Sequence, residues 1–139
     1  MEVPRVALVV EDDPRLQAVM KRHLEGMGLR VVASFHYRGA IRELETATPD
    51  VVSVDLELPA ESGYELCEHL RRQPALAAVP LLVTSARAFP ADMARAEEAG
   101  ANAFLRKPFS MGQLEHAIHM LLADVPAASS SWVRRLRYP

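Results

Sequence analysis

The fold is decided by the stretch Val51-Val52-Ser53-Val54-Asp55-Leu56-Glu57-Leu58-Pro59. Its first four residues form a short, mostly apolar and β-branched run, which predicts a buried strand. Asp55 ends this run and opens the turn that follows it. A carboxylate at the mouth of a buried strand is costly unless it is paired, solvated or used. We therefore interpret Asp55 as a candidate functional residue.

Three other apolar runs along the chain lead into polar side chains in the same way. They are Val6–Val10, followed by Glu11 and Asp12; Val79–Val83, followed by Thr84; and Ala103–Leu105, followed closely by Lys107. If these runs are parallel strands of one sheet, their carboxyl ends meet at one edge, where such sheets bind ligands. The sequence therefore predicts that these four side chains converge with Asp55.

Amphipathic segments with helical spacing separate the strand-like runs, and the alternation occurs five times. Helix starts are indicated by Asp13-Pro14, Ser62-Gly63-Tyr64-Glu65 and Ser110-Met111-Gly112-Gln113, which combine capping residues with a proline or a capping box. Strands that are apolar throughout need helices on both faces of the sheet. The expected fold is therefore an α/β, (βα)5, doubly wound parallel sheet of five strands.

Size and charge fit one domain followed by a short tail. The chain has 139 residues and a net charge of -2, so a general nucleic-acid footprint is not indicated. The single cysteine suits a reducing compartment, and neither a membrane span nor a signal peptide is indicated, so we expect a cytoplasmic protein. We expect a domain over residues 1–124 and a linker or basic tail over 125–139, which carries three arginines and no acidic residue.

The converging residues form a coherent set for phosphoryl chemistry. Crowded carboxylates need a cation, and a hard divalent ion such as Mg²⁺ (or Mn²⁺) takes oxygen ligands. Glu11, Asp12 and Asp55 would supply charge, together with the backbone carbonyl of Glu57. Asp55 could then act as a nucleophile toward phosphorus. Lys107 and Thr84 would contact the phosphoryl oxygens.

Several motifs in order resemble the receiver domain of response regulators in bacterial two-component signalling. They are Val9-Val10-Glu11-Asp12-Asp13, Val54-Asp55-Leu56 with Leu58-Pro59 and Ser62-Gly63-Tyr64, Val83-Thr84-Ser85, and Phe104-Leu105-Arg106-Lys107-Pro108-Phe109. The resemblance covers about residues 5 to 124. It implies a flavodoxin-like strand order, 2-1-3-4-5.

By this resemblance, Asp55 accepts a phosphoryl group from a histidine kinase or a phosphotransfer protein. The resemblance also implies a cis Lys107-Pro108 peptide and a switch pair formed by Thr84 and Phe104. The pair would remodel the face of the fourth helix, fifth strand and fifth helix, which then engages a protein target, a fused output domain or a second copy. The chain would be a phosphotransfer acceptor with slow self-dephosphorylation rather than an enzyme.

Two positions depart from the family pattern, and two other functions compete. Glu57 stands where many receivers carry a neutral or smaller residue, and Phe104 lacks the hydroxyl of a tyrosine switch. One alternative is an interaction domain that keeps the fold but works without phosphorylation. The other is a phosphatase of the haloacid-dehalogenase type, in which an Asp-x-Asp motif near the N-terminus carries the nucleophile. It is disfavoured because Asp55 lies in the middle of this chain and because Glu57 stands in place of the second aspartate.

Overall fold

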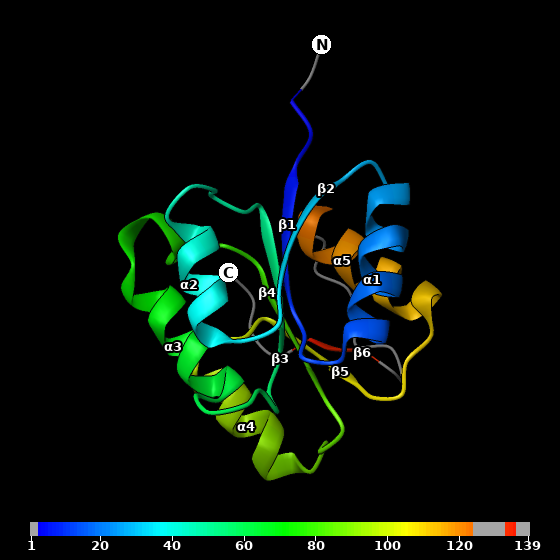
Figure 1. Cartoon of the computed structure of the whole chain (residues 1–139). Helices are drawn as coiled ribbons and strands as arrows, with labels where there is room; N and C mark the ends of the chain where they lie inside the picture. The colour runs from blue at the N-terminus through cyan, green and yellow to red at the C-terminus, as the bar shows by residue number, and fades with distance from the viewer. Residues whose placement is uncertain (1–2, 124–132, 136–139) are drawn as a thin grey trace.

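A single mixed sheet organises the computed structural model, which describes residues 3–123 and 133–135 (Figure 1). The strand order is β2-β1-β3-β4-β5-β6, and the first five strands are parallel. The strands are β1 Val6–Val10, β2 Arg30–Ser34, β3 Val51–Asp55, β4 Leu81–Ser85, β5 Ala103–Arg106 and β6 Val133–Arg135. The predicted order 2-1-3-4-5 is therefore confirmed.

Helices cover both faces of the sheet, as the apolar strands require. They are α1 Pro14–Gly26, α2 Tyr37–Leu44, α3 Gly63–Arg72, α4 Pro90–Glu98 and α5 Met111–Ala123, with a 3-10 turn η1 at Pro74–Leu76. Figure 1 shows α1 and α5 on one side and α2, α3 and α4 on the other. Alternate strand residues supply the two cores: Leu8 and Val10 face one, and Ala7 and Val9 face the other. Among the described residues, no helix is both long enough and apolar enough to span a membrane.

Helix starts follow the capping residues read from the sequence. The Asp13 carboxylate accepts hydrogen bonds from the backbone amides of Arg15 and Leu16. Ser110 and Gln113 form a reciprocal capping box, in which each side chain accepts from the other residue's amide. These caps satisfy donors that the first helical turn leaves without partners. They fix where each helix leaves the edge of the sheet that carries the polar residues.

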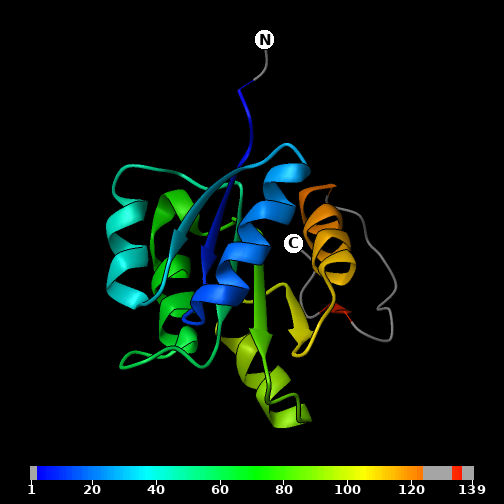
Figure 2. The same ribbon diagram turned by 45° about the vertical axis from the view of Figure 1, so that its right-hand side comes forward.

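The strand β6 is a finding that the sequence did not predict. It pairs antiparallel with β5, and Phe104 stands opposite Arg134 in the register. Figure 2 shows β6 (red) beside β5 (yellow), at the end of the sheet. The expected tail 125–139 thus contributes a sixth strand, while its residues 125–132 and 136–139 lie outside the described part of the chain.

Arg71, near the end of α3, joins its helix to two other segments, one that precedes β4 and one that precedes β5. Its guanidinium donates to the carbonyls of Gly100 (2.9 and 2.7 Å) and Val79 (2.7 Å) and to Asn102 Oδ1 (2.9 Å). Asn102 Oδ1 also accepts from the amide of Leu81, at the start of β4. Arg71 therefore ties α3 to the segments that enter β4 and β5, the two strands that carry Thr84 and Lys107.

Replacing Arg71 with alanine is expected to lower the free energy of unfolding by about 3 kcal/mol, because several partly buried carbonyls lose their donor together. Arg72→Ala is the matched control, since Arg72 is an exposed arginine in the same helical turn. Urea unfolding followed by circular dichroism measures both. Equal losses in the two variants would contradict the role given to Arg71.

Candidate functional site: an acidic pocket at the carboxyl edge of the sheet

The predicted site residues converge where the four central strands end. Asp55 is the last residue of β3 and stands opposite Thr84 of β4 in the register. Glu11 and Asp12 directly follow β1, and Lys107 directly follows β5. The parallel sheet with its order 2-1-3-4-5 therefore brings together residues that are up to 96 positions apart in the sequence, as predicted from the strand ends.

Lys107 lies between two buried carboxylates. Its Nζ is 2.8 Å from Glu11 Oε1 and 3.2 Å from Asp55 Oδ2. Glu11 and Asp55 are each only 1% exposed. The Lys107-Pro108 peptide is cis, as the resemblance implied. Because burial makes each unpaired charge costly, the ammonium group is needed to hold the two carboxylates at this edge.

The protonation of Asp55 is poised near neutrality. Its pKa is raised from 3.8 to about 7, chiefly by burial and also by the neighbouring Glu11 charge, while the Glu57 amide and Lys107 act in the opposite direction. That amide donates to Asp55 Oδ1 at 2.9 Å. Burial would lower the pKa of Lys107, but the carboxylates of Glu11 and Asp55 outweigh this effect and raise it. The pocket therefore holds a charged lysine and more carboxylate than one ammonium can neutralise.

The side chains fit a divalent cation. Glu11, Asp12 and Asp55 each offer an oxygen, and these oxygens lie within 4.8 Å of one another. Asp12 is exposed while the other two are buried, so the cluster opens to solvent on one side. An all-oxygen, carboxylate-rich donor set with access to water is what Mg²⁺ prefers. The residues present therefore match the cation predicted from the sequence, while the part assigned to the Glu57 carbonyl stays a prediction.

Thr84 contributes a hydroxyl that has no partner. Its Oγ1 is buried and makes no hydrogen bond among the described residues, and the residue is 1% exposed. Buried hydroxyls are normally satisfied, so this one is left available to bind a ligand beside the buried Asp55 carboxylate. Its register position opposite Asp55 supports the predicted contact with a phosphoryl oxygen.

The side chain of Glu57 is fully engaged elsewhere. Its two carboxylate oxygens accept from Ser85 Oγ and from the amide of Ala86, both at 2.8 Å. Ser85 Oγ also accepts from the amide of Arg87 at 2.9 Å. The carboxylate that departs from the family pattern therefore fastens the β3–α3 loop to the β4–α4 loop. Sequence reasoning missed this link, and with it the part that Ser85 plays.

Gly63 packs directly against the backbone of Asp55. A Cβ atom at position 63 would stand 2.3 Å from the carbonyl oxygen of Asp55 and 2.6 Å from Cα of Leu56. The amide of Gly63 also donates to the carbonyl of Leu56 at 3.1 Å. Any side chain here would push the backbone of Asp55, so the start of α3 can approach the site only because position 63 is glycine.

Phe104 is buried rather than displayed. It is 1% exposed and belongs to the core on the α2, α3 and α4 side of the sheet, with Val83 and Ala96. It stands opposite Val83 in β4, one residue from Thr84. Phe104 therefore lies beside β4, the strand that carries Thr84. Its role as a switch residue stays a prediction.

Replacing Asp55 with asparagine is expected to stabilise the cation-free protein at pH 8, by up to about 4 kcal/mol. The folded state holds the Asp55 proton more tightly than the unfolded state does, because the pKa is raised from 3.8 to about 7. Ionisation therefore costs no stability below pH 4, an increasing amount between pH 4 and 7, and the full amount above pH 7. Urea unfolding of both proteins between pH 4 and pH 8, with chelator, measures this difference.

The control for this prediction is Asp50→Asn, which removes a carboxylate that bonds the amide of Val6 at the opposite edge of the sheet. That variant should lose stability rather than gain it. A gain for Asp55→Asn that is the same at pH 4 and pH 8 would contradict a raised pKa as its cause.

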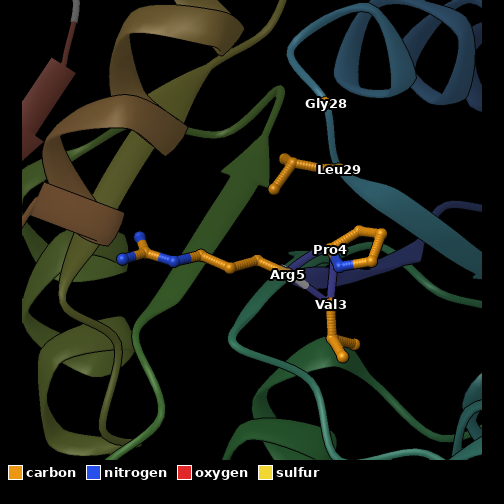
Figure 3. A pocket seen from close by; sticks show the side chains of 5 residues that line it. All are labelled: Val3, Pro4, Arg5, Gly28 and Leu29. Atoms are coloured by element: carbon orange, nitrogen blue, oxygen red, sulfur yellow. The ribbon is translucent and has the colours of Figure 1, made fainter. Parts of the chain in front are cut away.

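A hollow on the surface lies away from this chemistry. It is lined by Val3, Pro4, Arg5, Gly28 and Leu29, where β1 and β2 begin (Figure 3). Figure 3 shows Arg5 extended away from the other lining residues, and its guanidinium donates to the carbonyl of Leu122 in α5. The hollow therefore lies at the amino edge of the sheet, opposite the acidic pocket.

Comparison with known proteins agrees with the fold. Residues 7–119 match the response regulator receiver domain family. The KDP operon transcriptional regulatory protein KdpE of Escherichia coli is 36% identical over 115 residues, which are 83% of this chain and 50% of KdpE. The phosphate regulon transcriptional regulatory protein PhoB of the same organism is 33% identical over 121 residues, which are 87% of this chain and 53% of PhoB. The chain thus spans about half the length of these relatives.

Solved structures give the same result. The receiver domain of a signal transduction histidine kinase from Syntrophus aciditrophicus is 32% identical, with a TM-score of 0.79 over 91% of this chain and 96% of that one. The receiver domain of the sensor histidine kinase PA1611 from Pseudomonas aeruginosa, solved with a magnesium ion coordinated in its active site cleft, is 29% identical, with a TM-score of 0.79 over 87% of this chain and 99% of that one.

The fold, the acidic pocket and the matched length define a receiver domain of the kind used in two-component signalling. The chain belongs to the response regulator receiver domain family.

Proposed function

We propose that this chain is a phospho-accepting receiver in which Asp55 takes a phosphoryl group from a histidine kinase or a phosphotransfer protein. The observation that carries this proposal is the placement of Asp55. Its buried carboxylate lies 3.2 Å from Lys107 Nζ and opposite the unpartnered Thr84 hydroxyl, in a cluster of three carboxylates. Nucleophile, cationic partner, hydroxyl donor and cation ligands thus occupy one pocket.

The transfer requires Asp55 to be ionised. One of its oxygens attacks the phosphorus of the phosphohistidine, a P–O bond forms, and the P–N bond to the donor imidazole breaks. The pKa of about 7 leaves a substantial fraction of Asp55 ionised at neutral pH. Lys107 remains charged and lies on one side of Asp55, and Thr84 can donate its free hydroxyl to a phosphoryl oxygen.

Glu11, Asp12 and Asp55 would hold Mg²⁺, with the Glu57 carbonyl as a further ligand. When bound, the cation neutralises charge on the phosphoryl oxygens and on the carboxylates around them. Glu11 keeps its position through Lys107 and through the amide of Asp13, which donates to Glu11 Oε2 at 3.0 Å. Asp12 faces solvent and can bind the cation as it arrives.

The readout of phosphorylation is proposed from the family's behaviour. Thr84 and Phe104 would transmit the change to the face formed by α4, β5 and α5, which engages a target protein, a fused output domain or a second copy. KdpE and PhoB are transcriptional regulators of which this chain matches half, so an output carried by another domain suits the relatives. Slow self-dephosphorylation, rather than turnover of a free substrate, is the expected chemistry.

The experiment is binding of beryllofluoride, which mimics the phosphoryl group, in the presence of Mg²⁺. In amide nuclear magnetic resonance spectra, we expect saturable shifts at Glu57, Thr84 and Ser85 in the wild type and none in Asp55→Asn. The same shifts in the Asn variant would overturn the assignment of Asp55. Target binding that is identical in the two proteins would instead favour the phosphorylation-independent interaction domain.

A further inference from the structure

The outer edge of β5 is occupied by the chain's own tail. Strand β5 pairs with β4 on one edge, and on the other edge β6 adds three residues in antiparallel register. An unpaired edge strand offers its amides and carbonyls to any other strand. Here β6 fills that edge, next to the face through which a signal would leave the domain.

Only β5 lies between the tail strand β6 and β4, the strand that carries Thr84. Thr84 stands opposite Leu105, and Leu105 stands opposite Val133. Lys107 follows β5 directly, and its amide donates to the carbonyl of Ser85 at 2.8 Å. Thr84 and Lys107, which are expected to contact the phosphoryl group, are therefore both connected to β5. Thr84 lies on the strand paired with β5, and Lys107 is the next residue of the chain after β5.

The pairing between β6 and β5 is also short, so it can open reversibly. It spans three residues, whereas each of the four parallel pairings of the sheet spans four or five. A short edge strand is the kind of element that opens locally while the rest of a domain stays folded. Small movements of β5 can therefore shift the balance between the closed and the open edge.

We propose that β6 is a releasable clasp that closes the edge of β5 while Asp55 is unmodified, and that phosphorylation of Asp55 loosens it. This inference rests on the proposed function of Asp55. The unpartnered Thr84 hydroxyl gains a phosphoryl oxygen as its acceptor, and Lys107 shifts part of its contact from the carboxylates to the same group. Both changes act on the strands that carry the edge to which β6 is paired. The clasp thereby makes the β5 edge available only after modification.

The backbone amides of β5 and β6 report on the clasp, because the two strands pair with each other. The experiment measures hydrogen exchange of the segments 103–106 and 133–135 in the full chain, with and without beryllofluoride and Mg²⁺. We expect beryllofluoride to accelerate exchange in both segments, because the open population grows.

Two double variants serve as references. Successive residues of a strand point their amides to opposite edges, so one amide of Val133 and Arg134 faces β5. Val133→Pro with Arg134→Pro should therefore give the released exchange rate at 103–106 without beryllofluoride. Ala127→Pro with Ala128→Pro places two prolines in the tail outside β6 and should behave as wild type.

The outcomes separate the clasp from the function on which it rests. If beryllofluoride produces no shifts at Glu57 and Thr84, the proposed function fails and the clasp fails with it. If those shifts appear but exchange at 103–106 and 133–135 stays unchanged, the clasp is overturned while the proposed function stands. Exchange at 103–106 as slow as in the wild type in the Val133→Pro, Arg134→Pro variant would also overturn it.

Discussion

Replacing Asp12 with asparagine is expected to slow phosphorylation of Asp55 by acetyl phosphate by about 100-fold. Asp12 is the exposed member of the three-carboxylate cluster, and Glu11 is already committed to Lys107. Without the Asp12 charge, the cation binds more weakly and stabilises the transferring phosphoryl group less. A 100-fold slowing corresponds to an increase of about 3 kcal/mol in the activation free energy. Initial rates of labelling at fixed Mg²⁺ measure the effect.

Asp13→Asn is the matched control for this prediction. Asp13 is adjacent, exposed and loses the same charge, but its carboxylate caps α1 by accepting from the amides of Arg15 and Leu16. Asparagine caps helices about as well as aspartate does, so the fold should be kept. If Asp13→Asn slows labelling as much as Asp12→Asn, the effect comes from the general negative charge at this edge, and the assignment of Asp12 as a ligand is wrong.

Replacing Lys107 with alanine is expected to lower the free energy of unfolding by about 3 kcal/mol at pH 8 without divalent cations, because it leaves two buried carboxylates without their counterion. Glu11 Oε1 and Asp55 Oδ2 lie 2.8 and 3.2 Å from the ammonium nitrogen that would be lost. The loss should be smaller at pH 5, where Asp55, with its pKa of about 7, is mostly protonated in the folded state. Urea unfolding at both pH values measures this.

Saturating Mg²⁺ should restore much of the stability that Lys107→Ala loses, because the cation neutralises the same carboxylates. Arg106→Ala is the control, since Arg106 is the preceding residue and an exposed cation. Equal losses in Arg106→Ala and Lys107→Ala, with no recovery in Mg²⁺, would show that Lys107 does not hold the pocket together.

The strands and the acidic pocket were predictable because they are encoded locally. Each buried strand is a short apolar run, and the polar residue at its end is adjacent in sequence, as with Asp55 after Val54. Once five such runs alternate with amphipathic helices, the parallel sheet follows from the packing of its two apolar faces. The convergence of Glu11, Asp55, Thr84 and Lys107 therefore needed only the topology.

The features that escaped prediction depend on tertiary pairing. The sequence of β6 contains two arginines and spans three residues, so its strand conformation comes from the free edge of β5 rather than from its own pattern. The link from Glu57 to Ser85 joins a loop residue to the last residue of β4, 28 positions away. Arg71 bonds the carbonyl of Gly100, 29 positions away. Side-chain bonds between distant segments leave no periodic signal in the sequence.

The central claim is that Asp55 is the phosphorylation site, and intact-mass spectrometry after incubation with acetyl phosphate and Mg²⁺ tests it most directly. We predict one added phosphoryl group in the wild type, stable in acid and labile in base, mapped by peptide analysis to Asp55, and no such group in Asp55→Asn. Labelling of Asp55→Asn to the same extent, at a bond of the same acid and base stability, would contradict the account.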